Sequence, residues 1–311
     1  MITSFTTSPE EAAEFIRNGG LVAFPTETVY GLGANVFDES AVEKIFAAKQ
    51  RPPDNPLIVH VASIGEISDV TAEVTDTAKA LIARFFPGPL TVVLRKSDRI
   101  PSIATAGLDT VGVRMPQLDA TRRFLIACGV SVAAPSANIS GRPSPTTWQA
   151  VAEDLDGRID CILQGDATET GLESTVVDCT GEAPVILRAG SVTLEQLRKV
   201  VPDIRMGSVM DDQRRSPGTR HKHYKPAAKV VIVEHPMAVE KSPGTAYIGV
   251  VRSPTPFDYQ VVCGDVEDYA REFYEFLREC DRRGIHTIYC QQVPATDIGA
   301  ALMDRMRRAA G

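Results

Sequence analysis

The sequence predicts an α/β protein made of two units of unequal size. Its 311 residues exceed what one hydrophobic core usually organises, which favours two domains. Short apolar runs typical of strands alternate with amphipathic segments typical of helices through roughly the first 200 residues. A polar segment rich in Gly, Pro and charged residues then interrupts the pattern, and a shorter α/β pattern follows it. We therefore expect a first domain at residues 1–202, a linker at 203–227 and a small domain at 228–311.

The composition excludes some classes of protein. Hydrophobic residues make up 43% of the chain and charged residues 23%, which is typical of a globular protein rather than a disordered one. The net charge of -7 argues against a dedicated nucleic-acid-binding module, because such modules are usually basic. A local cluster of Arg and Lys can still form a cationic pocket for an anionic substrate.

Nothing in the sequence predicts export or membrane insertion. The N-terminus lacks the basic and apolar regions of a secretory signal, and no apolar run approaches the ~18 residues of a membrane span. The six cysteines are scattered without a CxxC pair, so we interpret them as reduced thiols with neither a metal nor a disulfide role. We expect a cytoplasmic protein.

The first helix has the clearest boundaries. Ser8 is suited to cap it, Pro9 to occupy its first position and Glu11 to complete a capping box. Gly19 suits its exit. A short apolar strand at residues 21–24 follows and leads into the segment PTETVYGLG, which we interpret as a polar turn.

The other elements of the first unit are predicted from helical periods or apolar runs. Helices are expected at residues 39–49, 75–85, 120–127, 147–155 and 193–200, the first ended by Pro52-Pro53 and the second by the PGP at 87–89. Strands are expected at residues 57–61, 90–94, 110–113, 130–134, 174–178 and 185–187, the last two as a hairpin.

The second unit repeats this alternation on a smaller scale. Strands are expected at residues 230–233, 245–250, 260–262 and 287–290. Helices are expected at residues 266–282 and 298–308, and the first of these is strongly amphipathic.

The chain lacks the usual glycine-rich loops that bind phosphate. There is no GxxxxGK[ST] motif, and Gly31-Leu32-Gly33 lacks the third glycine of a dinucleotide fingerprint. We interpret Gly31 and Gly33 as turn residues. A nucleotide would have to be held by side-chain cations and scattered backbone groups.

Several polar residues have both a structural and a functional interpretation. Lys49 and Arg51 follow a helix end, where cations complement the dipole, but the rigid PPDNP turn behind them could direct both at one site. The loop APSANISG after a strand is either an ordinary turn or a ligand loop, offering Ser136, Asn138 and Ser140.

Cations and histidines at strand ends leave similar alternatives open. Arg114 and Arg188 each end a strand, where an arginine either extends to solvent or binds a carboxylate or phosphate. His60 near a strand end is more typical of a core residue than of a ligand. His221 and His223 lack neighbouring metal-type ligands, so we predict no metal site there.

Eight short segments, taken in their order along the chain, resemble the YrdC-like threonylcarbamoyl-AMP synthases in their long, two-domain form. The segments that carry the resemblance are PTETVYGLG (25–33), KQRPPDNPL (49–57), the strand with His60, GVRMP (112–116), APSANISG (134–141), ESTVVD (173–178), LRAG (187–190) and SPGTRHKHYKP (216–226). Each is weak alone, whereas the ordered set is specific. The last 85 or so residues match only in length and α/β character.

The resemblance implies a fold and a set of site residues. The fold would be a YrdC-like twisted mixed sheet with flanking helices, followed by a smaller Rossmann-like α/β domain. Residues implied to bind ATP are Lys49, Arg51, Asn55, Thr110, Asn138, Ser144, Arg188 and Tyr224, with Lys49 and Arg51 as the catalytic charges. Residues implied to bind threonine are Thr28, His60, Arg114, Ser136 and Ser174. Mg2+ would arrive with the ATP phosphates, because no cluster of Asp and Glu offers a protein cage.

The implied reaction condenses L-threonine, bicarbonate or CO2, and ATP to threonylcarbamoyl-AMP and pyrophosphate. A downstream transferase complex would then use this adenylate to modify tRNA, with direct tRNA binding weak or absent. One alternative is a carbamoyltransferase that forms a carbamoyl-adenylate from carbamoyl phosphate on the same fold. The other is a non-catalytic RNA-binding module, which the acidic net charge disfavours.

Overall fold

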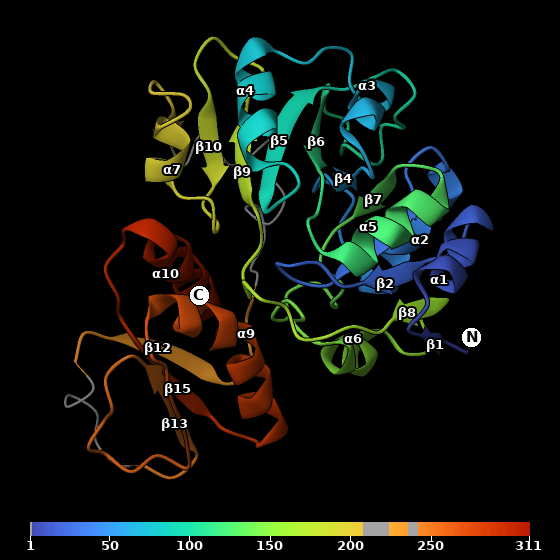
Figure 1. Cartoon of the computed structure of the whole chain (residues 1–311). Helices are drawn as coiled ribbons and strands as arrows, with labels where there is room; N and C mark the ends of the chain where they lie inside the picture. Colours follow the sequence, from blue (N-terminus) through green and yellow to red (C-terminus); the bar gives the residue numbers. More distant parts are fainter. Residues whose placement is uncertain (1, 208–223, 236–241) are drawn as a thin grey trace.

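The computed structural model describes residues 2–207, 224–235 and 242–311. Figure 1 shows these residues as two α/β units, each built around its own sheet. We call residues 2–207 the larger unit and residues 224–235 with 242–311 the C-terminal unit. The predicted fold class, a large mixed sheet with flanking helices followed by a smaller α/β unit, is confirmed. None of the described helices is long and apolar enough to cross a membrane.

The larger sheet has strands from the whole length of the larger unit. Its strand order is β1 (Ser4–Thr6), β8 (Cys161–Leu163), β2 (Val22–Phe24), β3 (Gly31–Asn35), β7 (Val132–Ala134), β4 (Ile58–His60), β6 (Thr110–Arg114), β5 (Leu90–Arg95), β9 (Thr175–Asp178), β10 (Val185–Arg188) and β11 (Arg205–Met206). Parallel and antiparallel pairs alternate irregularly, and β9 and β10 form the expected antiparallel hairpin.

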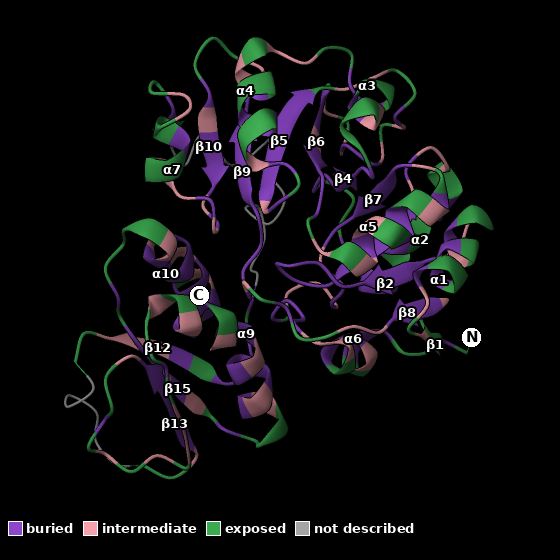
Figure 2. Cartoon of the chain, in the orientation of Figure 1, coloured by how far each residue is buried: buried purple, intermediate pink, exposed green. Residues whose placement is uncertain are grey.

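Helices flank this sheet, and all but the short α3 (Ile67–Val70) lie where the sequence predicts a helix. They are α1 (Pro9–Arg17), α2 (Glu39–Lys49), α3 (Ile67–Val70), α4 (Asp76–Phe85), α5 (Asp119–Cys128), α6 (Trp148–Leu155) and α7 (Leu194–Arg198). Figure 2 shows the inner strands mostly buried and the helices exposed on their outer faces, whereas the edge strands β1 and β11 are largely exposed. The main hydrophobic core of the larger unit lies between them.

The N-terminal cap of α1 differs from the prediction in one detail. Ser8 accepts a hydrogen bond from the backbone N–H of Glu11, as expected of a cap. The carboxylate of Glu11 accepts from the Thr6 hydroxyl, 2.6 Å away, and that same hydroxyl accepts from the Ser8 backbone N–H. The predicted capping box is therefore only half formed, because Thr6 takes the place of the Glu11 carboxylate.

The interpretation of Gly31 and Gly33 as turn residues is wrong. Both lie in strand β3, which pairs antiparallel with β2. A Cβ atom on Gly33 would lie 2.6 Å from a methyl carbon of Val132 and 2.9 Å from the ring of Phe24. Glycine is required here by close packing inside a sheet, and the polar turn is confined to the residues before it.

The C-terminal unit is a parallel sheet packed against two helices. Its strand order is β12 (Lys229–Val233), β15 (Thr287–Gln291), β13 (Thr245–Gly249) and β14 (Tyr259–Val262). Its helices are α9 (Val266–Arg282) and α10 (Asp297–Ala310). Four aromatic side chains of α9, at positions 269, 273, 274 and 276, are buried in this unit's core.

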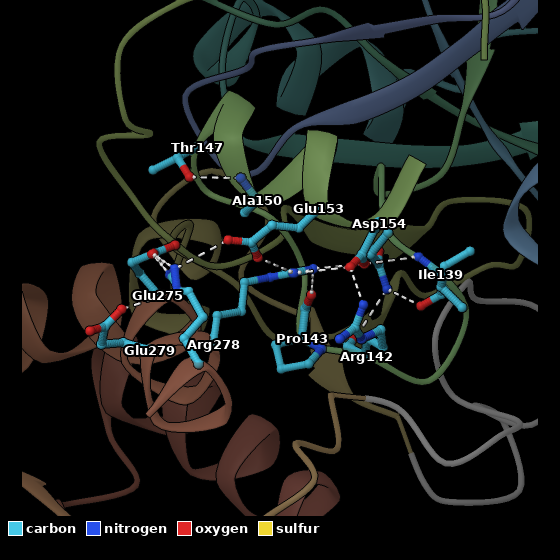
Figure 3. Close-up of polar contacts among 12 residues, drawn as sticks. Ile139, Arg142, Pro143, Thr147, Ala150, Glu153, Asp154, Glu275, Arg278 and Glu279 are labelled. Atoms are coloured by element: carbon cyan, nitrogen blue, oxygen red, sulfur yellow. Dashed lines mark hydrogen bonds and ion pairs between the residues drawn. The ribbon is translucent and has the colours of Figure 1, made fainter. Parts of the chain in front are cut away.

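Polar groups hold the two units against each other. Arg278 of α9 donates to Asp154 of α6 at 2.9 Å and to the Pro143 carbonyl at 2.6 Å (Figure 3). The Asp154 side chain is fully buried and also accepts from the backbone N–H of Ile139 and from Arg142. β11 ends four residues beyond the predicted first boundary, and the domain boundaries stay a prediction.

Candidate active site

One cavity, lined by the larger unit and by Tyr224 of the C-terminal unit, gathers most of the residues predicted to bind ATP or threonine. Those that line it are Thr28, Lys49, Arg51, His60, Arg114, Ser136, Asn138, Ser174, Arg188 and Tyr224. These side chains come from segments spread over almost 200 positions of the chain. Their functional roles stay predictions; what the structure adds is that they share one cavity.

Three predicted residues lie outside the lining. Asn55 is buried in the turn after α2, and its carbonyl accepts from Arg51 at 3.3 Å. Thr110 begins β6 and lines a separate, smaller cavity. Ser144 does not line the cavity itself, but its hydroxyl donates a hydrogen bond of 2.6 Å to the carboxylate of Glu173, which does.

Strand pairing positions the His60 and Arg114 side chains. β4 and β6 are parallel, and their last residues, His60 and Arg114, are directly paired in register. Both strands therefore deliver a basic residue to the same edge of the sheet, at the carboxyl ends of the strands, where α/β proteins commonly bind ligands.

Lys49 occupies the end of α2, behind the loop that follows β7. Gln50, in the left-handed conformation, ends the helix. The Lys49 ammonium donates to the carbonyl of Ser136 at 2.6 Å and to that of Asn138. Burial, and then repulsion from Arg51, hold the pKa of Lys49 well below its usual value. An incoming anion would favour the charged form of this amine.

Arg51 and Arg188 keep their charge at neutral pH despite burial. Burial lowers the pKa of Arg51 to about 10, which leaves the guanidinium protonated. Arg188 donates to the carbonyl of Ser174 at 3.1 Å and to its hydroxyl at 3.2 Å. The same hydroxyl lies 2.8 Å from that of Thr91, so Ser174 is fixed from two sides.

Arg114 and His60 form a second polar group in the cavity. Arg114 is paired with the buried carboxylate of Glu27 at 2.7 Å and donates to the Thr28 hydroxyl at 2.8 Å. Nδ1 of His60 is buried and has no hydrogen-bond partner among the described residues. Burial, with the nearby Arg114 charge, lowers the pKa of His60 to about 3, so its imidazole is neutral.

Tyr224 reaches the cavity from the linker side. It is buried, and its ring centroid lies 5.2 Å from that of Tyr274 of α9. The Arg305 guanidinium of α10 lies 5.8 Å from the same ring. The backbone N–H of Lys225 donates to the Gly141 carbonyl at 2.8 Å. Helices α9 and α10 therefore support Tyr224, which closes one side of the cavity.

Sequence reasoning missed Glu173. It lines the cavity and accepts hydrogen bonds from Ser144, Tyr274 and Arg305. Its position in ESTVVD is the only signal in the sequence, and nothing local reveals partners more than 100 residues away. Among the described residues, no group of three or more His, Cys, Asp or Glu side chains could hold a metal ion. His221 and His223 lie outside the described residues.

Comparisons with known proteins cover both units. A family model described as "Telomere recombination" matches residues 14–190, and one described as "Threonylcarbamoyl-AMP synthase, C-terminal domain" matches residues 192–311. A threonylcarbamoyl-AMP synthase from Pyrococcus abyssi is 45% identical, covering 96% of this chain and 93% of the relative. One from Bacillus subtilis is 41% identical, covering 98% and 94% respectively.

The structural comparison agrees with these sequence matches. A crystal structure of Pyrococcus abyssi Sua5 complexed with L-threonine matches with a TM-score of 0.90 and 41% identity. The match covers 100% of this chain and 97% of that one. The chain belongs to the threonylcarbamoyl-AMP synthase family, in the long form that carries the C-terminal domain.

Proposed function

We propose that this chain is an L-threonylcarbamoyladenylate synthase, which condenses L-threonine, bicarbonate or CO2, and ATP to threonylcarbamoyl-AMP and pyrophosphate. The observation that carries the proposal is the single cavity in which buried cations and small hydroxyl side chains meet. Near-full-length identity to synthases of this name supports it.

The chemistry needs positioning and charge more than a protein nucleophile. The neutral amine of threonine attacks CO2 to give a carbamate, and a carbamate oxygen then attacks the α-phosphorus of ATP. The bond from that phosphorus to the bridging oxygen breaks, and pyrophosphate leaves. Negative charge gathers at the phosphates, where Lys49, Arg51 and Arg188 supply preorganised cations.

The threonine end of the cavity would be formed by Arg114 and His60. Each terminal nitrogen of an arginine carries two N–H groups, so Arg114 can pair with Glu27 and Thr28 and still meet a carboxylate. His60 is neutral, which leaves its imidazole able to accept or donate one hydrogen bond to the substrate. A hydroxyl partner in the site would discriminate strongly against valine.

ATP would enter as its Mg2+ complex. Glu173 is the one acidic side chain among the described residues that line the cavity, and three donors already occupy it. The phosphate oxygens and water would therefore hold the ion. We further propose that the enzyme works in the cytoplasm and passes its labile adenylate to a separate transferase that acts on tRNA.

Product analysis tests the proposal. Purified protein is incubated with ATP, Mg2+, bicarbonate and each amino acid in turn, and the products are analysed by mass. We expect pyrophosphate and the threonylcarbamoyl-adenylate mass with threonine alone. Adenylate formation from carbamoyl phosphate without threonine would instead support the carbamoyltransferase alternative.

A further inference from the structure

Glu173 is an unusual group to find in the wall of an ATP site. The other charged side chains that line the cavity are cations, and this carboxylate is the one acidic group among the lining residues that the structure describes. A buried, uncompensated carboxylate would repel the phosphates, because charges interact strongly where water is excluded. Its partners therefore decide whether the cavity accepts a polyanion.

Two of its partners come from the C-terminal unit. Oε2 of Glu173 accepts from Nε of Arg305 at 3.0 Å, and the Tyr274 hydroxyl lies 3.1 Å from both carboxylate oxygens. The third partner is Ser144, whose hydroxyl donates to Oε1 at 2.6 Å. Ser144 is among the residues implied to bind ATP, so the carboxylate joins the C-terminal unit to the nucleotide site.

The Arg305 side chain is fully buried and fixed by several contacts. Its two terminal nitrogens donate to the Ala189 carbonyl at 2.9 Å and to Asp304 at 2.8 Å. Its guanidinium also approaches the ring of Tyr224. One arginine of α10 therefore contacts the loop after β10, the wall carboxylate and the linker tyrosine together.

The charged groups around Glu173 keep it ionised. Burial alone would raise its pKa, but Arg305, then Arg188 and the Ser144 hydroxyl outweigh burial and lower the pKa to about 2. Burial opposes the charge on Arg305 too, yet Glu173 and the surrounding groups raise the Arg305 pKa well above its usual value. Tyr224, Tyr274, Asp304 and Arg308 are further titratable groups nearby. The pair is thus fully ionic at neutral pH.

We propose that Arg305 is a positioning residue for the ATP site: it neutralises Glu173 and holds that carboxylate against Ser144, so that Glu173 does not offset the cavity's cations toward phosphate when the C-terminal unit is docked. This deepens the proposed function and rests on it for the identity of the nucleotide. It also gives the C-terminal unit a task in the reaction. An ion pair is a poor device for docking alone, because desolvation offsets its attraction.

The test compares four variants with the wild type: Arg305→Met, Glu173→Gln, the double variant, and Arg307→Met. Arg307 is exposed on the same helix and serves as the matched control. ATP affinity is measured by calorimetry, and KM is measured for ATP and for threonine. We expect Arg305→Met to weaken ATP binding about tenfold or more and to change the threonine KM far less. The double variant should recover most of the loss, and Arg307→Met should match the wild type.

The pH profile separates charge from packing. Without Arg305 the pKa of Glu173 rises, so the ATP-binding deficit of Arg305→Met should shrink as the pH falls from about 8 to about 5.5. A merely structural arginine would give a deficit that pH and Glu173→Gln leave unchanged, and that result would overturn the inference. Unchanged ATP affinity in Arg305→Met would overturn it as well.

Two further measurements keep the inference decidable. If Arg305→Met fails to fold, two other variants replace it. Arg305→Lys keeps the positive charge and should retain ATP binding, whereas Tyr274→Phe removes one hydrogen bond to Glu173 with little change in side-chain volume and should weaken ATP binding modestly. Weaker ATP binding in Arg305→Lys than in Tyr274→Phe would contradict the inference. Wild-type protein that bound ATP but formed no adenylate would refute the proposed function alone, and the ATP affinities would still decide the role of Arg305.

Discussion

At the scale of single residues, the strongest prediction concerns the two cations near the end of α2. Replacing Lys49 or Arg51 with Ala should lower adenylate formation by about 100-fold or more, because each supplies charge where the phosphates would lie. Pyrophosphate release measures the loss, and circular dichroism checks the fold. Lys44→Ala, an exposed change on the same helix, is the control. Full activity in both variants would refute this location of the phosphate site.

His60 should make the protein less stable in mild acid. Its folded pKa is about 3, whereas the unfolded value is about 6.5, so the unfolded chain binds the extra proton between these values. Stability is lost as the pH falls through about 6.5 and levels off below about 3. At pH 4.5 the loss from this group is roughly 2–3 kcal/mol relative to pH 7.5.

Urea unfolding of the wild type and of His60→Gln at both pH values tests this. The variant should lose less stability on acidification, by roughly the amount that His60 contributes. Glu173 also destabilises the fold as the pH falls, because its folded pKa is lowered, but it does so equally in both proteins. Identical losses in the two proteins would show that His60 is not buried neutral.

The sequence predicted which residue types line the cavity better than how they are paired. Lys49, Arg114 and Arg188 could be singled out because each ends a helix or strand, and Arg51 because it lies in the rigid turn just after α2. Glu173 could not, because its partners on α9 and α10 are 101 and 132 residues away. Pairings at such separations follow from tertiary packing, which no local pattern encodes.

At the scale of elements, the strands missed from the sequence were short or glycine-containing. β1 and β8 have three residues each, too few for a period to be visible. β3 contains two glycines, which normally weaken a strand, so its sequence pattern indicates a turn. Its neighbours Val132 and Phe24 leave no space for a side chain at Gly33.

Gly33→Val should therefore be strongly destabilising. The new side chain must displace Val132 and the Phe24 ring in a packed sheet, at a cost of about 3 kcal/mol. Gly65→Ala is the control, because the nearest atom to its new Cβ would be 3.7 Å away. Chemical unfolding of both variants gives the measurement. Equal stability of the two would mean that β3 does not pack as described.

The contact between α9 and α6 should be just as sensitive. Arg278→Met leaves Asp154 buried without its main cation, which costs about 3 kcal/mol. The same change removes the hydrogen bond from Arg278 to the Pro143 carbonyl, which helps to fix the loop that carries Asn138. ATP binding should therefore weaken too. Arg271→Met removes only surface pairs, with Asp268 and Glu272 on the same helix, and should cost at most about 1 kcal/mol. Comparable effects of the two variants in chemical unfolding would exclude a special role for Arg278.

At the scale of the whole molecule, the sequence predicted two α/β units but not how they share a site. The larger unit has hydrophobic cores of its own, whereas Val29 and Leu172 of that unit pack into the core of the C-terminal unit. A Cβ atom on Gly171 would lie 2.4 Å from Cα of Arg271, so the loop before Glu173 lies directly against α9. This close approach places the interface beside the active-site cavity.

A truncation after Gly207 tests whether the larger unit can fold without the C-terminal unit and still form the complete site. The fragment should fold, because its main cores lie within the larger unit, but it loses Tyr224, Tyr274 and Arg305. Glu173 then faces the phosphates without its cation, so ATP affinity should fall about tenfold or more. Adding Glu173→Gln to the fragment should restore part of that affinity, while turnover stays low because Tyr224 is missing. Calorimetry gives the ATP affinity of the fragment, and a turnover assay on the same preparation gives its activity. Undiminished turnover in the fragment would show that the cavity is complete without the C-terminal unit.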